Sequence, residues 1–421
     1  MTTVVLLGTL DTKGHEYKFV MDCLHEAGVE SIMVDFGVLI DPEFQPDIGA
    51  QEVARQGGEE LRDLRSSTER SDTRANALAT MTKGLIKILK QLREENRCDA
   101  VFGLGGSGGS SVISEAMQSL PIGVPKLLLS TMASGNVGGY IGTKDIAIMY
   151  SVTDIAGLNR VSRPILRNAA YGIAGMAKGV SAAEVESKPL ISVTMFGITT
   201  TGVLRIVEKL EENGFETIVF HANGSSRAME ELIDEGLING IIDYTLSELT
   251  DYTLGGAFHA GPNRLEAAGR QGIPQLVVPG GIEVLNFGPR ETVPDKYDQP
   301  KRKLIIHNPY VCAVRINQQE SVQLGTLVAE KLNRAKGPTA VMVPLNGLDK
   351  YEAPPDGPWI DKEKDRALFN ALRLNLRPDI AYTEIDDYIN NHEFADAIVE
   401  AFVELWKEHQ KEKGILGEPG D

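Results

Sequence analysis

The chain has 421 residues and a formal net charge of −17, because 59 Asp and Glu outnumber 42 Lys and Arg. A surface this acidic repels nucleic acid and anionic lipid, so we expect neither as a partner. The hydrophobic fraction of 42% is typical of globular proteins and argues against disorder, and the length predicts two or three domains.

The cysteine positions and the hydropathy of the chain exclude further classes of protein. The three cysteines, Cys23, Cys98 and Cys312, form no CxxC pair, which excludes a disulfide scaffold and a cysteine-based zinc module. The first residues lead directly into an apolar segment, without the pattern of a secretory signal. No uninterrupted apolar stretch reaches the roughly 18 residues of a membrane span. We therefore expect a cytoplasmic protein that does not cross a membrane.

The first half alternates short, nearly continuous apolar runs with amphipathic stretches. Such runs predict parallel strands buried on both faces. The predicted strands are residues 4–7, 31–36, 100–104, 126–130 and 146–152, and the predicted helices are residues 14–27, 74–95, 110–120 and 159–178. This alternation indicates right-handed crossovers and a doubly wound sheet.

A polar stretch at residues 179–188, followed by Pro189, is interpreted as a linker between domains 1–182 and 183–421. The alternation then restarts. The predicted strands are residues 190–196, 217–220, 241–244, 275–278, 304–306, 340–344 and 380–384, and the predicted helices are residues 201–213, 227–235, 262–271, 318–333, 362–374 and 393–411. We expect two Rossmann-like, doubly wound α/β domains with mainly parallel sheets, and a frayed tail from residue 414.

The strongest motif is the run GLGGSGGSS at residues 103–111, between a predicted strand and a predicted helix. Glycines let the backbone approach a ligand, and the helix start offers N–H groups to an anion. The run is not a Walker A loop and fits the dinucleotide fingerprint only loosely, and a tight turn with a serine N-cap is the alternative. We favour a phosphate or carboxylate site made by Gly105, Gly106, Ser107, Gly108, Gly109 and Ser110.

Two further loops follow predicted strands of the same sheet. One contains Thr9, Asp11 and Lys13, and the other contains Ser134, Gly135 and Asn136. Ligands of open parallel sheets lie at the carboxyl ends of the strands, so we expect these loops to complete one pocket. Lys13 suits a phosphate, whereas Asp11 either joins the site or caps the following helix.

The second domain has its own polar groups near predicted strand ends and helix starts. They are His221, Glu248, His259, Arg264 and His307. Histidine and glutamate can transfer protons or bind a metal, and arginine can hold an anionic substrate. No HExxH or HxH spacing fixes a metal, and a hydrogen-bonded structural role is the alternative for each histidine. We expect these candidate catalytic residues to face a cleft between the domains.

Several loops together resemble those of one family. They are residues 8–13 (GTLDTK), 103–111, 130–136, 220–229 and 284–289, with His307 and Asn308. Over about residues 3–405 the chain resembles the Tm-1-like ATP-binding domain family, which includes the N-terminal inhibitory domain of the tomato mosaic virus resistance protein. The resemblance implies two Rossmann-like subdomains, a homodimer or higher homo-oligomer, and ATP at the glycine-rich region, with Mg²⁺ as a candidate companion. The plant protein joins this module to a barrel domain, which here would be a separate polypeptide.

The leading hypothesis is an ATP-binding α/β protein, and the sequence leaves open whether it is an enzyme acting on a small carbonyl or carboxylate metabolite. One alternative is a non-catalytic ligand-binding or regulatory module. Another is a metal-dependent lyase or hydrolase centred on the second domain.

Overall fold

The computed structural model describes residues 2–67, 71–179, 188–300 and 302–414. The chain divides into two compact units, Met1–Val185 and Glu186–Asp421, called here the N-terminal and C-terminal units. The predicted linker falls almost entirely on residues 180–187, and most of the predicted tail on residues 415–421; both lie outside the described residues. Within the described ranges, none of the helices combines the length and the apolar composition needed to span a bilayer.

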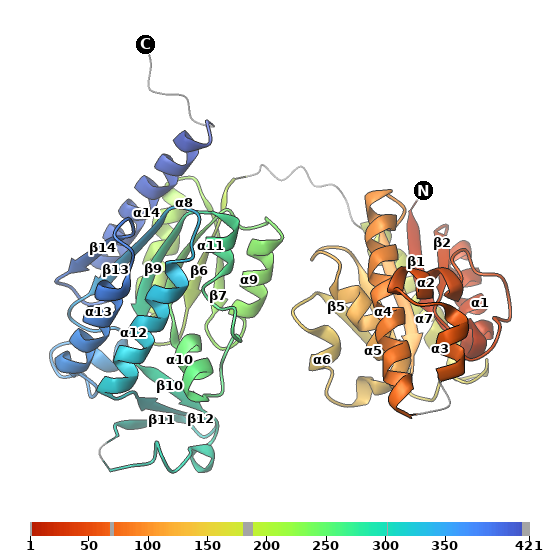
Figure 1. The fold of residues 1–421 in the computed structure, drawn as a ribbon, viewed down its shortest axis with the longest axis horizontal. Helices are drawn as coiled ribbons and strands as arrows, with labels where there is room; N and C mark the ends of the chain where they lie inside the picture. Colours follow the sequence, from red (N-terminus) through yellow and green to blue (C-terminus); the bar gives the residue numbers. More distant parts are fainter. Residues whose placement is uncertain (1, 68–70, 180–187, 301, 415–421) are drawn as a thin grey trace. The chain divides into compact units, whose positions relative to one another are not determined.

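The N-terminal unit is built on a five-stranded sheet with the order β2-β1-β3-β4-β5, in which every pair of neighbours is parallel (Figure 1). Its strands are β1 (Thr3–Gly8), β2 (Glu30–Asp35), β3 (Ala100–Gly105), β4 (Lys126–Ser130) and β5 (Ile146–Tyr150). Its helices are α1 (Leu10–Glu26), α2 (Ala50–Gly57), α3 (Leu61–Ser67), α4 (Ser71–Glu94), α5 (Ser107–Gln118), α6 (Gly138–Ile141) and α7 (Ser162–Gly179), with a 3-10 turn η1 (Thr131–Ser134).

Helices cover both faces of this sheet. Val4 and Leu6 pack in one apolar cluster with α1 and α7, whereas Val5 and Leu7 pack in another with α2, α4 and α5. Successive side chains of a strand point to opposite faces of the sheet. A strand whose two faces are both covered by helices must therefore be apolar throughout. The continuous apolar runs of the sequence therefore predicted this doubly wound sheet correctly.

The C-terminal unit contains a six-stranded sheet with the order β14-β13-β9-β8-β6-β7, again parallel throughout. Its strands are β6 (Leu190–Met195), β7 (Glu216–His221), β8 (Gly240–Thr245), β9 (Gln275–Gly280), β13 (Thr339–Pro344) and β14 (Ala381–Ile385). A three-stranded antiparallel sheet, β10-β12-β11, is formed by β10 (Val284–Phe287), β11 (Leu304–Asn308) and β12 (Val311–Arg315).

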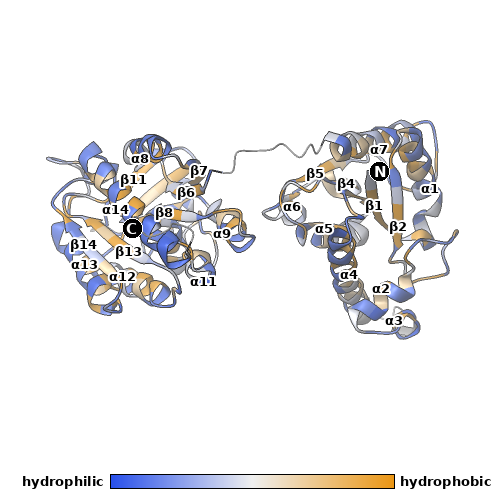
Figure 2. Ribbon diagram, turned by 90° about the horizontal axis from the view of Figure 1, so that it is seen from above, coloured by the Kyte–Doolittle hydropathy of each residue, from blue (hydrophilic) through white to orange (hydrophobic). Residues whose placement is uncertain are grey.

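Helices also cover both faces of the larger sheet. They are α8 (Thr200–Glu212), α9 (Ser226–Asp234), α10 (Ser247–Leu254), α11 (Ala267–Gln271), α12 (Gln318–Leu332), α13 (Lys362–Asn375) and α14 (His392–Glu412), with 3-10 turns η2 (Arg290–Thr292) and η3 (Lys350–Glu352). Residues of α8 and α14 share one apolar cluster with the strands, and residues of α10, α12 and α13 share another. Figure 2 shows hydrophobic residues gathered on strands inside each unit, and hydrophilic residues on outward helix faces.

The structure differs from the predicted elements in several places. Two helices, α2 and α3, occupy a stretch in which no element was predicted, and α10, β10 and β12 were not predicted either. Helix α5 begins three residues earlier than predicted, at Ser107, with Gly106 in extended conformation as its N-cap. Strand β5 ends at Tyr150 rather than at residue 152, since Val152 has a φ of 64° that a strand does not accommodate.

Candidate functional site

The strand order of the N-terminal unit defines a switch point. The chain runs from β1 to β2 on one side and continues with β3 on the other side of β1. In open α/β sheets the crevice outside the carboxyl ends of the strands at such a reversal is the usual ligand site. The loops that follow β1 and β3 are two of the three loops predicted to share a pocket.

Helix α5 presents its N-terminus at this switch point. The first helical hydrogen bond runs from the Ser110 N–H to the Gly106 carbonyl oxygen at 2.8 Å. The N–H groups of Ser107, Gly108 and Gly109 lie ahead of it, where a helix has no internal acceptor for them. The first turn carries no acidic side chain. This helix start can therefore donate to an anion.

The glycines of residues 103–109 differ in what they do. A Cβ on Gly103 would lie 2.5 Å from the Ile113 side chain, and one on Gly105 would lie 3.0 Å from the Ser110 nitrogen. These two glycines are needed for packing. A Cβ on Gly106 would meet nothing closer than 3.8 Å, and one on Gly109 would meet nothing within 4 Å. Packing gives no reason for these two glycines, whereas access of a ligand to the backbone does.

A pocket of about 380 Å³ opens at the switch point. The loop after β1 and the loop after β3 form its polar walls, and the loop after β2 together with α4 forms an apolar wall. The lining residues are Thr9, Asp11, Thr12, Lys13, Phe36, Val38, Leu39, Ala77, Leu78, Met81, Gly105, Gly106, Ser107, Gly108 and Gly109. The apolar wall was not among the predicted site residues, because Leu78 and Met81 resemble ordinary core positions of an amphipathic helix.

Asp11 and Lys13 hold the loop after β1 in place. Asp11 is buried, and one carboxylate oxygen accepts a hydrogen bond from the Leu39 N–H at 2.9 Å while the other, Oδ1, has no partner. Asp11 is thus not the N-cap of α1, a position that Thr9 occupies. The Lys13 ammonium donates to the carbonyl oxygen of Ile155 at 2.5 Å. Both side chains line the pocket, and both also connect loops.

Ser110 connects two loops instead of lining the pocket. It is fully buried, and its hydroxyl lies 2.7 Å from the Ser130 hydroxyl, which also accepts from the Met132 N–H. The predicted residues Ser134, Gly135 and Asn136 are exposed and do not line the pocket. The structure therefore brings together the loops after β1 and β3 in one pocket, and the loop after β4 supports them through the contact of Ser130 with Ser110.

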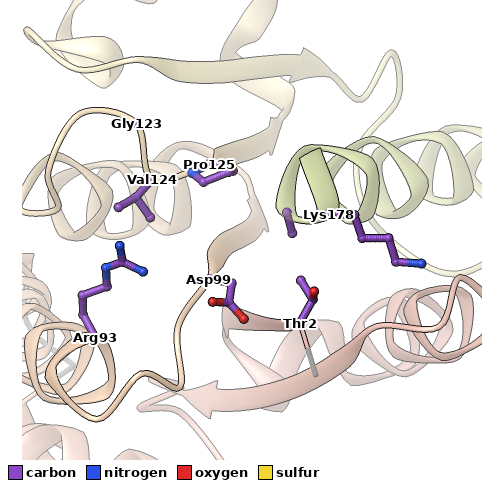
Figure 3. Close-up of a pocket in the computed structure, with 8 residues that line it drawn as sticks. Thr2, Arg93, Asp99, Gly123, Val124, Pro125 and Lys178 are labelled. Carbon is purple, nitrogen blue, oxygen red and sulfur yellow. The ribbon is translucent and has the colours of Figure 1, made fainter. Parts of the chain in front are cut away.

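Another pocket, of about 350 Å³, lies at the opposite end of the strands of the same sheet (Figure 3). Thr2, Asp99 and Pro125, which line it, immediately precede β1, β3 and β4. The amino ends of parallel strands are not where open sheets of this type bind ligands, so this pocket is the weaker candidate.

In the C-terminal unit Arg264 and Glu248 belong to a buried ion-pair network. The Arg264 guanidinium donates to Asp243 at 2.5 Å and to Glu248 at 2.9 Å, and it lies 3.5 Å from Glu230. All four side chains are buried. Burial opposes the charged form of Arg264, yet the surrounding carboxylates raise its pKa. The network joins β8, α9, α10 and the segment before α11.

The three histidines predicted as candidates divide between two pockets. His221 and His307 line a pocket of about 230 Å³ between the ends of β6 and β7 and the small antiparallel sheet. His259 lines a different pocket of about 320 Å³, beside α9. Among the described residues, no three His, Cys, Asp or Glu side chains are grouped so that they could hold a metal ion. The expected cleft between the domains stays a prediction.

The structure also groups residues that sequence reasoning missed. Tyr351 lines the pocket of His221 and His307, with its hydroxyl 3.4 Å from Nδ1 of His307. The two residues are 44 positions apart, and no sequence signal connects them. Elsewhere in the C-terminal unit Arg315 pairs with Glu352 and Asp365 in a buried cluster that also contains Glu283 and Asp349.

Comparison with known proteins identifies the family. Residues 2–182 match the model described as "Uncharacterised protein family (UPF0261) N-terminal domain", and residues 188–406 match that of the C-terminal domain. A UPF0261 protein of Clostridium tetani is 44% identical over 404 residues, which is 96% of this chain and 98% of that protein. The ToMV resistance protein Tm-1(GCR237) of Solanum lycopersicum is 38% identical over 343 residues, which is 80% of this chain and 45% of that protein.

Among solved structures, a putative UDP-N-acetylglucosamine 2-epimerase from Listeria monocytogenes aligns with 100% of this chain and 99% of its own, at 12% identity and a TM-score of 0.22. A score this low carries no argument about function. The sequence matches confirm the resemblance predicted from the loops: the chain belongs to the UPF0261 family and is similar to the tomato Tm-1 proteins.

Proposed function

We propose that the N-terminal unit binds a nucleotide, ATP, in the pocket between the ends of β1 and β3. The observation that carries the proposal is the start of α5 on the wall of this pocket. There Gly106 and Gly109 have no packing role, and the N–H groups of residues 107–109 precede the first helical hydrogen bond. Such a helix start is suited to a phosphate group.

The remaining walls suit the other parts of a nucleotide. Phe36, Leu78 and Met81 offer an apolar surface for a base, and Lys13 lies on the polar side with the phosphates. The volume of about 380 Å³ is within the usual range of ligand sites, roughly 300–1,000 Å³. The family resemblance of the loops favours ATP over other phosphorylated ligands.

Mg²⁺ fits the proposal as a companion of the triphosphate. Asp11 is the carboxylate among the described lining residues, and its Oδ1 has no hydrogen-bond partner. Magnesium sites in nucleotide-binding proteins commonly use one or two carboxylates together with the phosphates. Asp11 would hold the ion there, and the ion would neutralise phosphate charge.

We also propose that the protein is a homodimer and is located in the cytoplasm. A barrel-domain protein is proposed as a separate partner. ATP binding is compatible with two hypotheses, an enzyme that acts on a small metabolite and a non-catalytic regulatory module. Turnover of ATP in the presence of small carbonyl compounds would favour the enzyme reading, and ligand-dependent change of oligomeric state without turnover would favour the regulatory one.

Calorimetric titration with ATP and ADP in the presence of Mg²⁺ tests the proposal. A Cβ at Gly106 meets nothing closer than 3.8 Å, so we expect Gly106→Val to fold normally while its side chain blocks the helix start. We expect this variant to bind ATP at least about tenfold more weakly, or about 1.4 kcal/mol. Gly139→Val is the matched control, because a Cβ there meets nothing within 4 Å and the residue lies outside the pocket. Absence of ATP binding by the unmodified chain at millimolar ligand would refute the proposal.

A further inference from the structure

The C-terminal unit has a pocket of its own at the carboxyl ends of β6 and β7. Gly197 and Ile198 follow β6, His221 ends β7, and the small antiparallel sheet forms the facing wall. Strands β6 and β8 are the neighbours at which the strand order of this sheet reverses, so the pocket lies beside a second switch point. Its volume of about 230 Å³ suits a compact molecule.

The lining indicates the charge of that molecule. Among the described residues that line the pocket, none is Lys, Arg, Asp or Glu. A ligand carboxylate or phosphate would therefore meet no lysine or arginine and would lack the charge-assisted hydrogen bonds that these side chains supply. The polar lining consists of the amides of Asn223, Asn286 and Asn308, together with two imidazoles and one phenol.

Amides and imidazoles both donate and accept hydrogen bonds, which matches hydroxyl and carbonyl groups on a neutral ligand. Asn286 is held in place, because its amide nitrogen donates to Asp251 at 3.2 Å. Phe196 and Phe258 add aromatic surface for the C–H groups of such a ligand. The lining thus favours a small, neutral, hydroxylated carbonyl compound over a carboxylate.

Two histidines, His221 and His307, line this pocket, and His307 has a side-chain partner. The Tyr351 hydroxyl lies 3.4 Å from Nδ1 of His307, and the Tyr351 ring packs on Trp359 with centroids 4.7 Å apart. We assign the Tyr351 hydroxyl as the donor to Nδ1 in this pair, because burial and the nearby Asp349 raise the pKa of Tyr351 and a protonated phenol can donate. In the neutral ring the proton of His307 is then on Nε2. His221 lines the same pocket from β7, with its ring edge against Phe196 at 5.3 Å.

We propose that this pocket binds a small neutral hydroxy-carbonyl compound and catalyses proton transfer at the carbon beside its carbonyl group, with His221 as base and His307 as acid. His221 takes the proton from that carbon, and the electron pair of the broken C–H bond forms the C=C bond of an enediol. The π electrons of the C=O bond move to the carbonyl oxygen. This oxygen takes the proton from Nε2 of His307 and so forms an O–H bond. Return of the protons gives back the substrate or its isomer, and no oxidant or reductant is needed. Tyr351 acts as a positioning residue for His307.

This inference deepens the enzyme reading and does not depend on ATP binding by the N-terminal unit. The test uses dihydroxyacetone in D₂O with the full chain, followed by ¹H NMR. We expect loss of its C–H signals faster than in buffer. General acid–base groups contribute roughly 10²–10⁴-fold, so His221→Gln and His307→Gln should each slow the exchange at least about 100-fold. Tyr351→Phe keeps the ring and should lower kcat without changing KM.

His392→Gln is the matched control, since His392 is an exposed histidine of the same unit and does not line this pocket. His221 and His307 are exposed as well, so their variants should keep the melting temperature of the unmodified chain. Absence of exchange with both dihydroxyacetone and erythrulose would overturn the inference, and so would exchange that survives both substitutions. ATP titration of the same preparation separates this failure from failure of the nucleotide proposal.

Discussion

At the residue scale, the structure separates groups that hold the fold from groups that face a pocket. Arg264 and Glu248 were predicted as candidate catalytic residues, and they lie in a buried network in which the guanidinium is bonded to carboxylates and to the Thr245 carbonyl oxygen. His221 and His307 are exposed and share a pocket. In the sequence, Arg264, Glu248 and the two histidines gave the same signal, a polar residue near a predicted strand end or helix start. Their partners, which come from distant positions, decide between the two roles.

Removing the arginine from the buried network should destabilise the C-terminal unit strongly. Arg264→Met leaves Asp243, Glu248 and Glu230 without their cation, and breaking a buried pair from one side costs about 3–5 kcal/mol. Urea unfolding measures the loss. Arg227→Ala, on the exposed face of α9, should change stability by less than about 0.5 kcal/mol. Equal effects of the two substitutions would contradict the structural role of Arg264.

Buried carboxyl groups predict that the stability of the C-terminal unit falls as pH rises. Burial raises the pKa of Asp251 to about 7, and burial together with Glu352 raises that of Asp349 to about 8. In the unfolded chain these groups titrate near pH 4, roughly the ordinary value for aspartate. Between these values the folded chain holds more protons, so their stabilisation is complete below about pH 4 and is lost as pH rises through 7 and 8.

Thermal unfolding between pH 5 and 9 measures this dependence. The melting temperature should decrease with pH, and Asp349→Asn should weaken the decrease because the amide cannot ionise. A melting temperature that rises over this range, in the unmodified chain, would contradict the neutral state of the buried carboxyl groups.

At the element scale, the apolar runs predicted the strands of both parallel sheets well, because a strand buried on both faces has to be apolar throughout. They predicted the start of α5 poorly. Residues 107–109 read SGG, which has low helix propensity, and the extended backbone of Gly106 together with packing against β3 overrides that preference. The antiparallel strands β10 and β12 are short, and the pairing of β12 with β10 and β11 depends on contacts that a pattern does not reveal.

The bond between Ser110 and Ser130 predicts a supporting role for the loop after β4. Ser110→Ala removes the 2.7 Å contact between the two hydroxyls and should cost about 1 kcal/mol of stability, with little change in ATP affinity. Ser134→Ala, at an exposed position of the same loop, should change neither quantity. A tenfold loss of ATP affinity in Ser110→Ala would instead make Ser110 a ligand contact.

At the scale of the whole molecule, the two units have separate sheets and separate apolar clusters. Composition and length predicted more than one domain, and the alternation of strands and helices predicted the class of each. Which strand ends carry pockets depends on strand order. The sequence does not state that order, because it depends on which strands become neighbours.

The most direct test of nucleotide binding by the N-terminal unit uses the units separately. Residues 1–185 and 186–421 are produced as two polypeptides, and each is titrated calorimetrically with ATP and Mg²⁺ after its folding is verified by circular dichroism. The account predicts that the first polypeptide binds ATP at one site with the affinity of the full chain, and that Gly106→Val weakens this binding at least about tenfold. ATP binding by the second polypeptide, with none by a folded first polypeptide, would contradict it.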